Sequence, residues 1–231
     1  MNDLLHSVQI QVDERVYLKD PNSSELGKRI VQEGLLLIEE IGLEAMTFRK
    51  LAKRLQTTES SVYRYFDSKF KFLIYLTSWY WGWIEYQLVF STSNVQDPLT
   101  KLKSCIEIIS RHASQQGNNQ MNLEVLNRVV IAESSKSYLT KAVGEANKVG
   151  YYAGYKLVVR RISDIMLEIN PTFAFSHTLT STIIEGIHHQ QYFAQHLPSL
   201  TEKTKTQSQL ADFYSALALS TLKSNYIKED V

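Results

Sequence analysis

The sequence contains few of the residues that crosslink a chain or interrupt its helices. Its 231 residues include one cysteine, four prolines and nine glycines. The single cysteine, Cys105, excludes an intramolecular disulfide, and nothing in the sequence indicates export. The amino terminus has no basic segment followed by an apolar run, and no stretch reaches the roughly 18 uninterrupted apolar residues of a membrane span. We therefore expect a soluble, cytoplasmic protein with no membrane partner.

The positions of the prolines and the scarcity of strand patterns favour a helical fold. All four prolines fall between long helix-compatible stretches. Pro98 follows Asp97, the order typical of an N-cap with proline at the first helical position. Apolar and polar residues alternate as in a strand only over residues 8–12, which have no evident partner. The sequence predicts an all-α protein of about nine helices, preceded by a poorly defined N-terminal arm.

The first predicted helix covers residues 24–41. Its apolar positions are spaced by three and four residues, as on one face of a helix. Gly42 follows as its terminator, because glycine accepts the left-handed backbone that often ends a helix. The residues expected on the apolar face are Ile30, Gly34, Ile38 and Ile41.

Two shorter helices and the start of a fourth follow. The second helix begins after Thr47 and the third after Thr58, because both hydroxyl groups suit an N-cap. The third runs to about Phe66, and the fourth begins after Asp67 and Ser68. This succession predicts a three-helix bundle that contains a helix-turn-helix.

The third predicted helix has the composition of a helix that enters a DNA groove. Val62 and Phe66 are its expected apolar anchors, which leaves small and hydrogen-bonding side chains for the outer surface and the ends. Residues 47–75 contain seven Lys and Arg against two acids, giving 7 − 2 = +5 in a chain whose net charge is +1. Such concentrated positive charge is typical of DNA binding. The residues left for the outer surface are Glu59, Ser61, Tyr63, Arg64 and Tyr65.

Two segments resemble the tetracycline-repressor (TetR) family of transcriptional regulators. Residues 47–52 read Thr-Phe-Arg-Lys-Leu-Ala, and residues 60–69 read Ser-Ser-Val-Tyr-Arg-Tyr-Phe-Asp-Ser-Lys. The resemblance covers about residues 24–75, and the rest of the chain shares only length and helicity with such proteins. It implies an N-terminal arm (1–23), a helix-turn-helix DNA-binding domain (24–72) and a C-terminal helical domain (73–231) for ligand sensing and dimerisation.

The resemblance also implies roles for individual side chains. Thr47 would cap the second helix and contact a phosphate, Arg64 would read guanine or hold a phosphate, and Lys69 would hold a phosphate. Tyr63 and Tyr65 would reach the DNA with their hydroxyl groups, or they are ordinary packing aromatics. Two positions depart from the family pattern: Gln56 stands where glycine is common, and Glu59 brings a carboxylate to the groove. The expected DNA-binding residues are Thr47, Thr58, Glu59, Ser61, Tyr63, Arg64, Tyr65 and Lys69.

Aromatic residues of the C-terminal domain leave two interpretations open. Three tryptophans at positions 79, 81 and 83 cannot share one helix face, because each step of two residues turns the helix by about 200°. Packing between domains is favoured over ligand contact for most of them. A pocket of aromatics with few charges would suit an apolar or aromatic effector. The candidate pocket residues are Trp79, Trp83, Tyr86, Tyr151, Tyr155 and His188.

Histidines near the C-terminus raise the question of a metal site. The spacing of Glu185 and His189 places a carboxylate and an imidazole on one helix face, with His188 and His196 on the same helix. We favour interface or pocket-edge positions for these residues, and we assign no metal and no cofactor. The stretch 181–196 and the helix at 209–226 are amphipathic. The resemblance implies that these last two long helices form a homodimer interface, and Leu210, Phe213, Leu217, Thr221 and Leu222 form one apolar stripe there.

Together these features predict a ligand-responsive regulator, a repressor that binds a palindromic double-stranded DNA operator as a homodimer and is released or tuned by a small molecule. An enzyme is not expected, because the sequence has no glycine-rich phosphate loop, Gly-x-Ser-x-Gly turn or recognisable Cys-His pairing. The alternative is a helical small-molecule carrier or interaction protein that has lost DNA binding, which Gln56 and Glu59 would favour. In the arm, Arg15 and Lys19 suit a minor-groove contact, whereas four acids there favour disorder or packing against the bundle.

Overall fold

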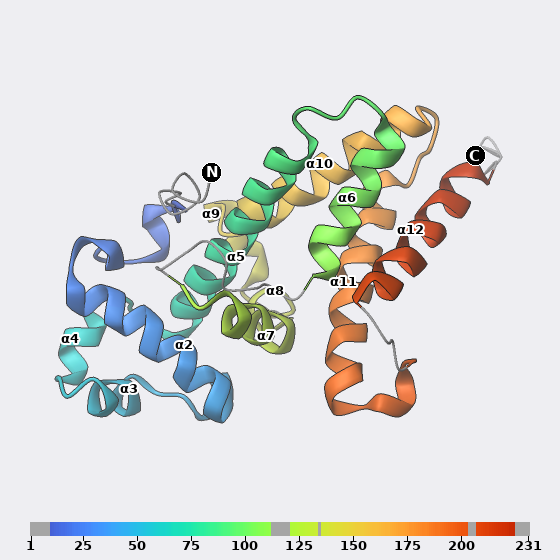
Figure 1. Ribbon diagram of the computed structural model, residues 1–231. Coiled ribbons are helices and arrows are strands. Elements are labelled where there is room, and N and C mark those ends of the chain that lie inside the picture. Colours follow the sequence, from blue (N-terminus) through green and yellow to red (C-terminus); the bar gives the residue numbers. More distant parts are fainter. Residues whose placement is uncertain (1–9, 112–120, 134, 203–206, 225–231) are drawn as a thin grey trace. The chain divides into compact units, whose positions relative to one another are not determined.

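The computed structural model describes residues 10–111, 121–133, 135–202 and 207–224 (Figure 1). Within these ranges the chain has eleven α-helices, three 3-10 helices and no strand, which confirms the all-α prediction. Two more α-helices are present than expected, because short helices form between α7 and α10. The elements are η1 (Glu14–Val16), η2 (Pro21–Ser23), α2 (Glu25–Ala45), α3 (Phe48–Arg54), α4 (Glu59–Tyr63), α5 (Lys69–Thr92), α6 (Pro98–Ser110), α7 (Leu123–Glu133), α8 (Ser135–Tyr138), α9 (Val143–Val149), α10 (Ala153–Ile169), α11 (Ser176–His196), η3 (Pro198–Leu200) and α12 (Gln207–Lys223).

One expectation about the first part of the chain changes. Of the suggested strand at 8–12, Val8 and Gln9 lie outside the described residues, and residues 10–12 form no strand. No helix in the described ranges is long and apolar enough to cross a membrane.

The described chain forms two compact units. The first lies within residues 1–83 and 113–154, and the second within 84–112 and 155–231. Helix α5 therefore contributes to both units. These two units are defined by contacts between residues. The boundary predicted between residues 72 and 73 separates two functions, DNA binding and ligand sensing, and stays a prediction.

Helix α5 is buried on several faces within the first unit. A helix that is covered all round must carry apolar residues on every face. This explains how tryptophans on different faces of α5 are all removed from solvent. Trp79, Trp81 and Trp83 are 2%, 4% and 6% exposed, and Phe72, Leu73, Ile74 and Leu76 are fully buried.

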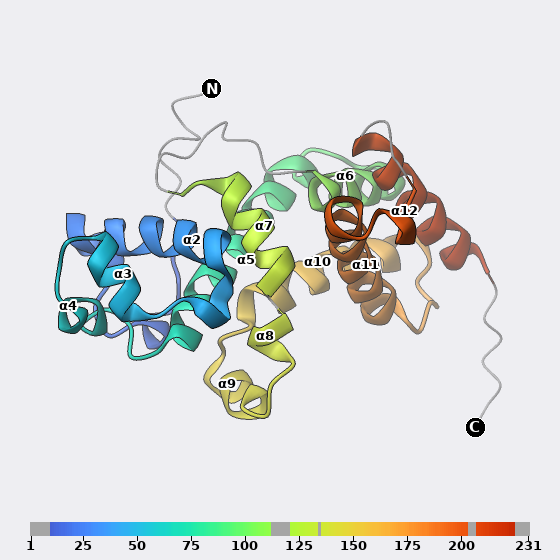
Figure 2. The same ribbon diagram turned by 90° about the horizontal axis from the view of Figure 1, so that it is seen from below.

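Helix α2 packs closely on α5 and α7. A Cβ atom at Gly34 would lie 2.4 Å from Cζ of Phe72, so that only glycine allows this approach. The helix breaks at Gly42, whose φ of 76° agrees with its predicted role as terminator, and one further turn leads to Ala45. Glu133 of α7 accepts a hydrogen bond of 3.1 Å from the amide of Leu43, directly after the break. Both views show α7 beside α2 (Figures 1 and 2).

Ile41 differs from its expected position on the apolar face of this helix. Its side chain is 39% exposed, whereas Ile30 and Ile38 are buried as predicted. The prediction was wrong because Ile41 lies in the last turn before the break at Gly42, beyond the part of the face that the bundle covers.

The second unit is built from α6, α11 and α12, which lie together in both views (Figures 1 and 2), and from α10. Gly186 of α11 allows Tyr214 of α12 to approach, because a Cβ there would lie 2.5 Å from the tyrosine hydroxyl. A buried polar contact also joins two of these helices. Gln191 Nε2 donates to the carbonyl of Ser110 at 2.9 Å, which joins α11 to α6.

Candidate nucleic-acid interface

Helices α3 and α4 each begin at the cap that the sequence predicts. The Thr47 hydroxyl accepts the amide of Lys50 at 3.2 Å, and the Thr58 hydroxyl accepts the amide of Ser61 at 3.3 Å. These bonds satisfy amides that have no partner inside the helix. The Thr58 hydroxyl also lies 2.8 Å from that of Ser61 and 2.9 Å from that of Ser60, so that three hydroxyl groups gather at the start of α4.

The turn between α3 and α4 requires a left-handed residue. Gln56 occupies this position with φ 55°. The amide of Thr57 bonds the carbonyl of Ala52 at 2.9 Å, and the amide of Gln56 bonds that of Lys53 at 3.2 Å. This pair of bonds is the Schellman motif, in which glycine is the usual left-handed residue. The backbone conformation that makes glycine common at this position is here adopted by Gln56.

Buried anchors hold α4 in place. Val62 and Phe66 are fully buried, as predicted. The Phe66 ring packs edge-on against Phe72 and Tyr75 of α5, with centroid separations of 5.0 and 5.4 Å. A helix of only five residues gains little stability by itself, so these contacts fix its orientation.

The opposite side of α4 faces solvent. Glu59, Tyr63 and Arg64 are exposed, and Ser61 is half-buried. The Tyr63 ring leans edge-on against Phe48 at 5.0 Å, yet 46% of the residue stays exposed. This surface combines hydroxyl groups, a carboxylate and a guanidinium, which are groups that bond base edges and phosphates.

Tyr65 does not belong to this exposed surface, contrary to the prediction. The residue is 4% exposed, and its hydroxyl lies 2.7 Å from that of Ser24. Its position directly after α4 turns the ring inward, because Val62 and Phe66 on the same side are drawn into the core. The sequence alternative of a packing aromatic holds for Tyr65.

Lys69, at the start of α5, bonds the end of α2. Its Nζ donates to the carbonyls of Leu43 and Glu44 at 3.2 and 3.0 Å. The last carbonyls of a helix lack partners inside it, and a cation there also meets the negative end of the helix dipole. In this structure Lys69 thus joins α5 to the turn before α3.

Several basic residues counted in the sequence are engaged within the protein. Arg54 bonds Glu33 and Glu40, each at 2.6 Å, which raises the pKa of Arg54 and lowers that of Glu40. Lys71 pairs with Asp67 at 2.8 Å. Lys50 Nζ donates to a backbone carbonyl, that of Ala45, at 2.8 Å.

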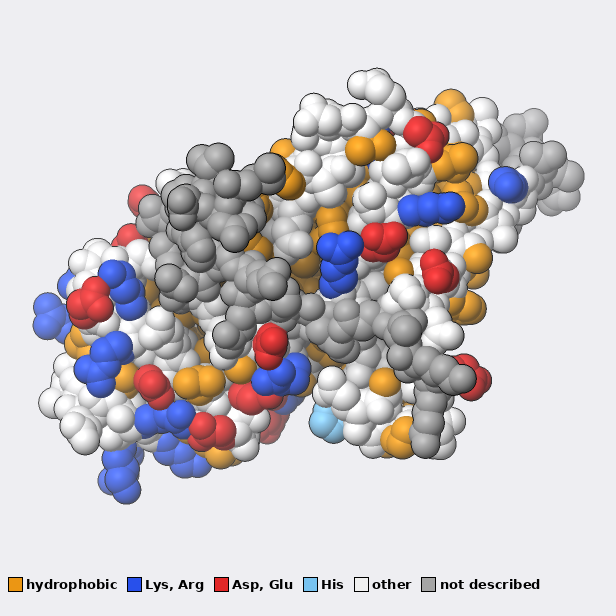
Figure 3. All heavy atoms as spheres, in the orientation of Figure 1, with side chains coloured by type: hydrophobic (Ala, Val, Ile, Leu, Met, Phe, Trp, Pro, Cys, Tyr) orange, Lys and Arg blue, Asp and Glu red, His pale blue; other side chains and the backbone are white. Residues whose placement is uncertain are grey.

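The remaining basic residues face outward around α3 and α4. Arg49, Lys53 and Arg64 are exposed and make no ion pair with another described residue. Figure 3 shows Lys and Arg side chains gathered over the end of the first unit where α3 and α4 lie. The positive charge open to a polyanion is therefore smaller than the sequence count, but it surrounds the exposed side of α4.

The candidate pocket residues fall in both units. In the first, Trp79 and Trp83 stack with centroids 6.2 Å apart, and the Tyr151 hydroxyl donates to the carbonyl of Arg15 at 3.2 Å. In the second, Tyr86 stacks on Phe90 with centroids 6.5 Å apart, and the Tyr155 hydroxyl donates to Glu185 at 2.7 Å. His188 is 3% exposed, and burial lowers its pKa to about 4. Their joint role in ligand binding stays a prediction.

A cavity of about 630 Å³ lies elsewhere in the first unit. None of the candidate pocket residues is among the residues that form its wall. The sequence did not predict this cavity, because residues 1–23 were expected to be disordered or to pack against the bundle and no local pattern indicates a cavity. Its lining comprises Ile10, Gln11, Val12, Asp13, Glu14, Arg15, Tyr17, Asp20, Asn22 and Tyr75.

The histidines of α11 do not meet as a metal site in the described residues. No group of three His, Cys, Asp or Glu side chains there is arranged to hold a metal ion. Glu185 instead accepts the Tyr155 hydroxyl, and His189 stacks on Phe193 with centroids 5.9 Å apart.

A known protein family matches the part of the chain that contains α3 and α4. Residues 30–76 match the family described as "Bacterial regulatory proteins, tetR family". This range contains α3, α4 and most of α2. No curated protein sequence matches the chain.

Solved structures share the fold at low sequence identity. AibR, in complex with isovaleryl coenzyme A and operator DNA, has a TM-score of 0.59 and 12% identity over 82% of this chain and 97% of its own. A tetR-family regulatory protein from Rhodococcus RHA1 gives 0.63 and 15% over 86% and 97%. The ketosteroid transcriptional regulator KstR2 of Mycobacterium tuberculosis gives 0.57 and 15% over 92% and 97%.

Proposed function

We propose that this chain, which belongs to the tetR family of bacterial regulatory proteins through its residues 30–76, is a DNA-binding transcription regulator that responds to a small molecule. One observation carries the proposal: α4 is anchored by Val62 and Phe66 and turns its polar side to solvent. This arrangement is what a recognition helix needs to enter a major groove.

The exposed residues of α4 would read the operator, and the cations around it would hold the backbone. Arg64 has the bidentate donor geometry that suits guanine or phosphate. Arg49 and Lys53 would add sequence-independent affinity. Lys69 would act by fixing the turn before α3, and Tyr65 by supporting α4 from inside. The proposed direct contacts are Thr47, Thr58, Glu59, Ser61, Tyr63 and Arg64.

A homodimer is part of the proposal, because a helix of five residues contacts too few base pairs for specificity. Two copies about one DNA turn apart would read a palindromic operator. Helix α12 offers a surface for this pairing. Phe213 and Leu217 are 59% and 38% exposed on it, and large apolar side chains that share a helix face favour a protein interface.

The effector is proposed to bind in residues 73–231 and to lower operator affinity, which makes the protein a cytoplasmic repressor. AibR, whose structure contains isovaleryl coenzyme A and operator DNA, and the ketosteroid transcriptional regulator KstR2 support an effector that carries an apolar group. The candidate aromatic residues suit such a molecule. The effector would bind the form with low operator affinity more tightly than the DNA-binding form, and this difference in affinity would set how far operator binding falls.

The test is selection of bound genomic fragments by the purified chain, followed by titration at two salt concentrations. Arg64→Ala should weaken binding to the selected fragment about fivefold to 100-fold. Arg160→Ala is the matched control, because Arg160 is an exposed arginine of α10. It should leave binding unchanged.

Two results would contradict the proposal. Either no fragment is selected, or the Arg64 variant binds as well as the unchanged protein. The first would favour the helical small-molecule carrier that has lost DNA binding, with the exposed carboxylate of Glu59 on α4 as its structural mark. The second would exclude Arg64 as an operator contact.

A further inference from the structure

Residues 10–23, which we call the N-terminal strap, are bonded to Tyr65, which lies two residues after the end of α4. The amide of Leu18 donates to the carbonyl of Tyr65 at 2.8 Å. Lys19 Nζ lies 5.2 Å from the centre of the Tyr65 ring, within the range of a cation–π contact. Ser24, directly after the strap, bonds the Tyr65 hydroxyl at 2.7 Å. Three neighbouring residues thus hold Tyr65 from one side.

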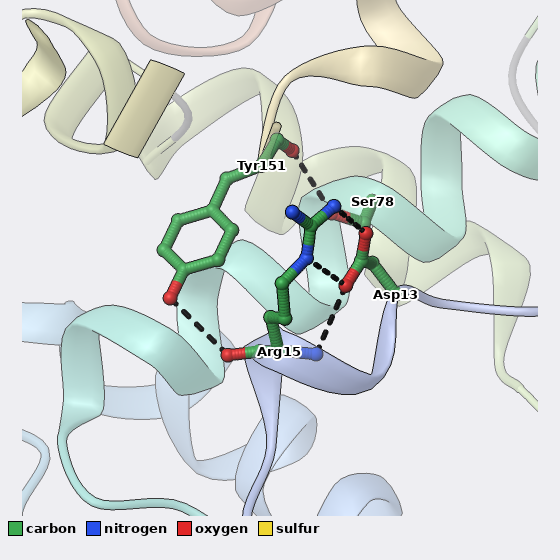
Figure 4. A network of polar contacts seen from close by, with 4 residues as sticks. All are labelled: Asp13, Arg15, Ser78 and Tyr151. Atoms are coloured by element: carbon green, nitrogen blue, oxygen red, sulfur yellow. Dashed lines mark hydrogen bonds and ion pairs between the residues drawn. The ribbon is translucent and has the colours of Figure 1, made fainter. Parts of the chain in front are cut away.

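The strap is also bonded, through Arg15, to the connection between α9 and α10 (Figure 4). The Tyr151 hydroxyl donates to the carbonyl of Arg15 at 3.2 Å. The carbonyl of Tyr151 in turn accepts from Ser78 of α5 at 3.4 Å. Tyr151 therefore joins the strap to α5 through its own backbone and side chain.

An ion pair inside the strap fixes the carbonyl that Tyr151 uses. Asp13 accepts from Arg15 Nε at 2.8 Å and from Arg15 Nη2 at 2.5 Å, and it caps η1 by accepting the Arg15 amide at 2.9 Å. This pairing raises the pKa of Arg15 and lowers that of Asp13. An exposed pair adds little stability. Its effect is geometric, since it closes the turn that presents the Arg15 carbonyl.

The strap also contacts α2 and α5 directly. Val16 is fully buried, and the Tyr17 ring meets Tyr75 edge-on with centroids 6.2 Å apart. A Cβ at Gly27 of α2 would lie 2.2 Å from the Pro21 carbonyl oxygen. A Cβ at Gly82 of α5 would lie 2.7 Å from Ile10. These contacts fix the strap to α2 and α5, while the same segment lines the cavity of about 630 Å³.

We infer that the N-terminal strap positions α4 for DNA and couples it to the connection between α9 and α10. Only three positions separate Arg15, held by Tyr151, from Leu18, which holds Tyr65. A movement of Tyr151 would therefore reach the end of α4 through the strap as well as through α5. The inference rests on the proposed DNA-binding function and adds a regulatory contact to it.

Hydrogen exchange of the backbone amides tests the coupling without DNA. In Tyr151→Phe the bond to Arg15 is lost, and exchange of the Leu18 amide and of the amides of residues 62–66 should rise about threefold to tenfold. Tyr152→Phe is the matched control. Its hydroxyl donates to the carbonyl of Ser137 at 2.6 Å, away from the strap, so exchange at those amides should not change.

A second pair of variants tests the contact with Tyr65. Leu18→Pro removes the amide that donates to Tyr65, whereas Leu18→Ala keeps it. Leu18 is 61% exposed, so its side chain contributes little packing. The proline variant should raise exchange over residues 62–66 and weaken operator binding about threefold to tenfold. The alanine variant should do neither.

The outcomes separate this inference from the proposed function. If hydrogen exchange over residues 62–66 is unchanged in both Tyr151→Phe and Leu18→Pro, the inferred coupling through the strap is wrong, whether or not the protein binds DNA. An equal rise of exchange in Tyr152→Phe also contradicts the coupling, because both variants would then destabilise the first unit in general. Increased exchange in a protein that selects no DNA supports the coupling and contradicts only the proposed function.

Discussion

Among the described residues, Gln56 is the only non-glycine residue with a positive φ, at 55°. A left-handed conformation costs an L-residue with a side chain roughly 1–2 kcal/mol. Gln56→Gly should therefore raise the free energy of unfolding by about 0.5–1 kcal/mol, after the greater backbone freedom of glycine in the unfolded chain is subtracted. Urea unfolding measures this difference.

The control is Gln56→Ala, which removes the amide group and keeps the strained backbone. It should give no gain in stability. If the glycine and alanine variants unfold at the same urea concentration, the strain at this turn is not what limits stability.

His188 predicts a pH dependence of stability. Burial lowers its pKa from 6.5 to about 4, opposed by the charge of Glu185, while His189 lowers it further. Between these values the unfolded chain binds a proton that the folded chain does not, so stability falls as pH drops from about 6.5 towards 4. A shift of this size corresponds to roughly 3 kcal/mol. His188→Gln should flatten the stability profile over that range.

His177→Gln serves as the comparison, because His177 is an exposed residue of the same helix. That variant should keep the slope of the unchanged protein. Equal slopes for all three proteins would show that His188 is protonated at the same pH whether the chain is folded or unfolded.

At the scale of elements, the contact of α2 with α5 depends on a missing side chain. A Cβ at Gly34 would lie 2.4 Å from the ring of Phe72, which is fully buried and has no space to move. Gly34→Ala should therefore lower the free energy of unfolding by about 1–3 kcal/mol through overpacking. Differential scanning calorimetry would detect it as a lower Tm.

Gly144→Ala provides the opposite case within the first unit. Nothing lies within 4 Å of a Cβ at Gly144, which is in α9. Alanine favours a helix over glycine by about 1 kcal/mol, so this variant should be as stable as the unchanged protein or more so. A similar loss in both variants would show that the effect of Gly34→Ala does not come from the packing of α2 on α5.

At the scale of the whole molecule, the proposed homodimer depends on the exposed side of α12. The double variant Phe213→Lys, Leu217→Lys places two charges on this surface, and burying an unpaired charge is strongly unfavourable. We expect it to sediment as a monomer and to lose operator binding, because two half-sites are then no longer read together.

Leu139→Lys controls for the addition of charge, since Leu139 is 79% exposed and lies outside the proposed interface. It should sediment like the unchanged protein. A double variant that remains dimeric would exclude this side of α12 as the interface.

The sequence by itself determined the elements of the proposed DNA-binding domain. N-caps at Thr47 and Thr58, the break at Gly42 and the anchors Val62 and Phe66 depend on neighbouring residues, so local chemistry identifies them. For residues 73–231 the sequence predicted helices but not the position of a pocket. Helical periodicity carries no information about which helix faces which.

Tertiary structure alone decided what the individual polar and aromatic groups contact. Tyr63 and Tyr65 look equivalent in sequence, yet one is 46% and the other 4% exposed. Lys69 bonds the end of α2, and Arg54 bonds two acids of α2, although both count as free positive charge in the sequence. The strap was beyond sequence analysis for the same physical reason: its bonds to Tyr65 and Tyr151 join residues far apart in the chain, and no local pattern encodes such contacts.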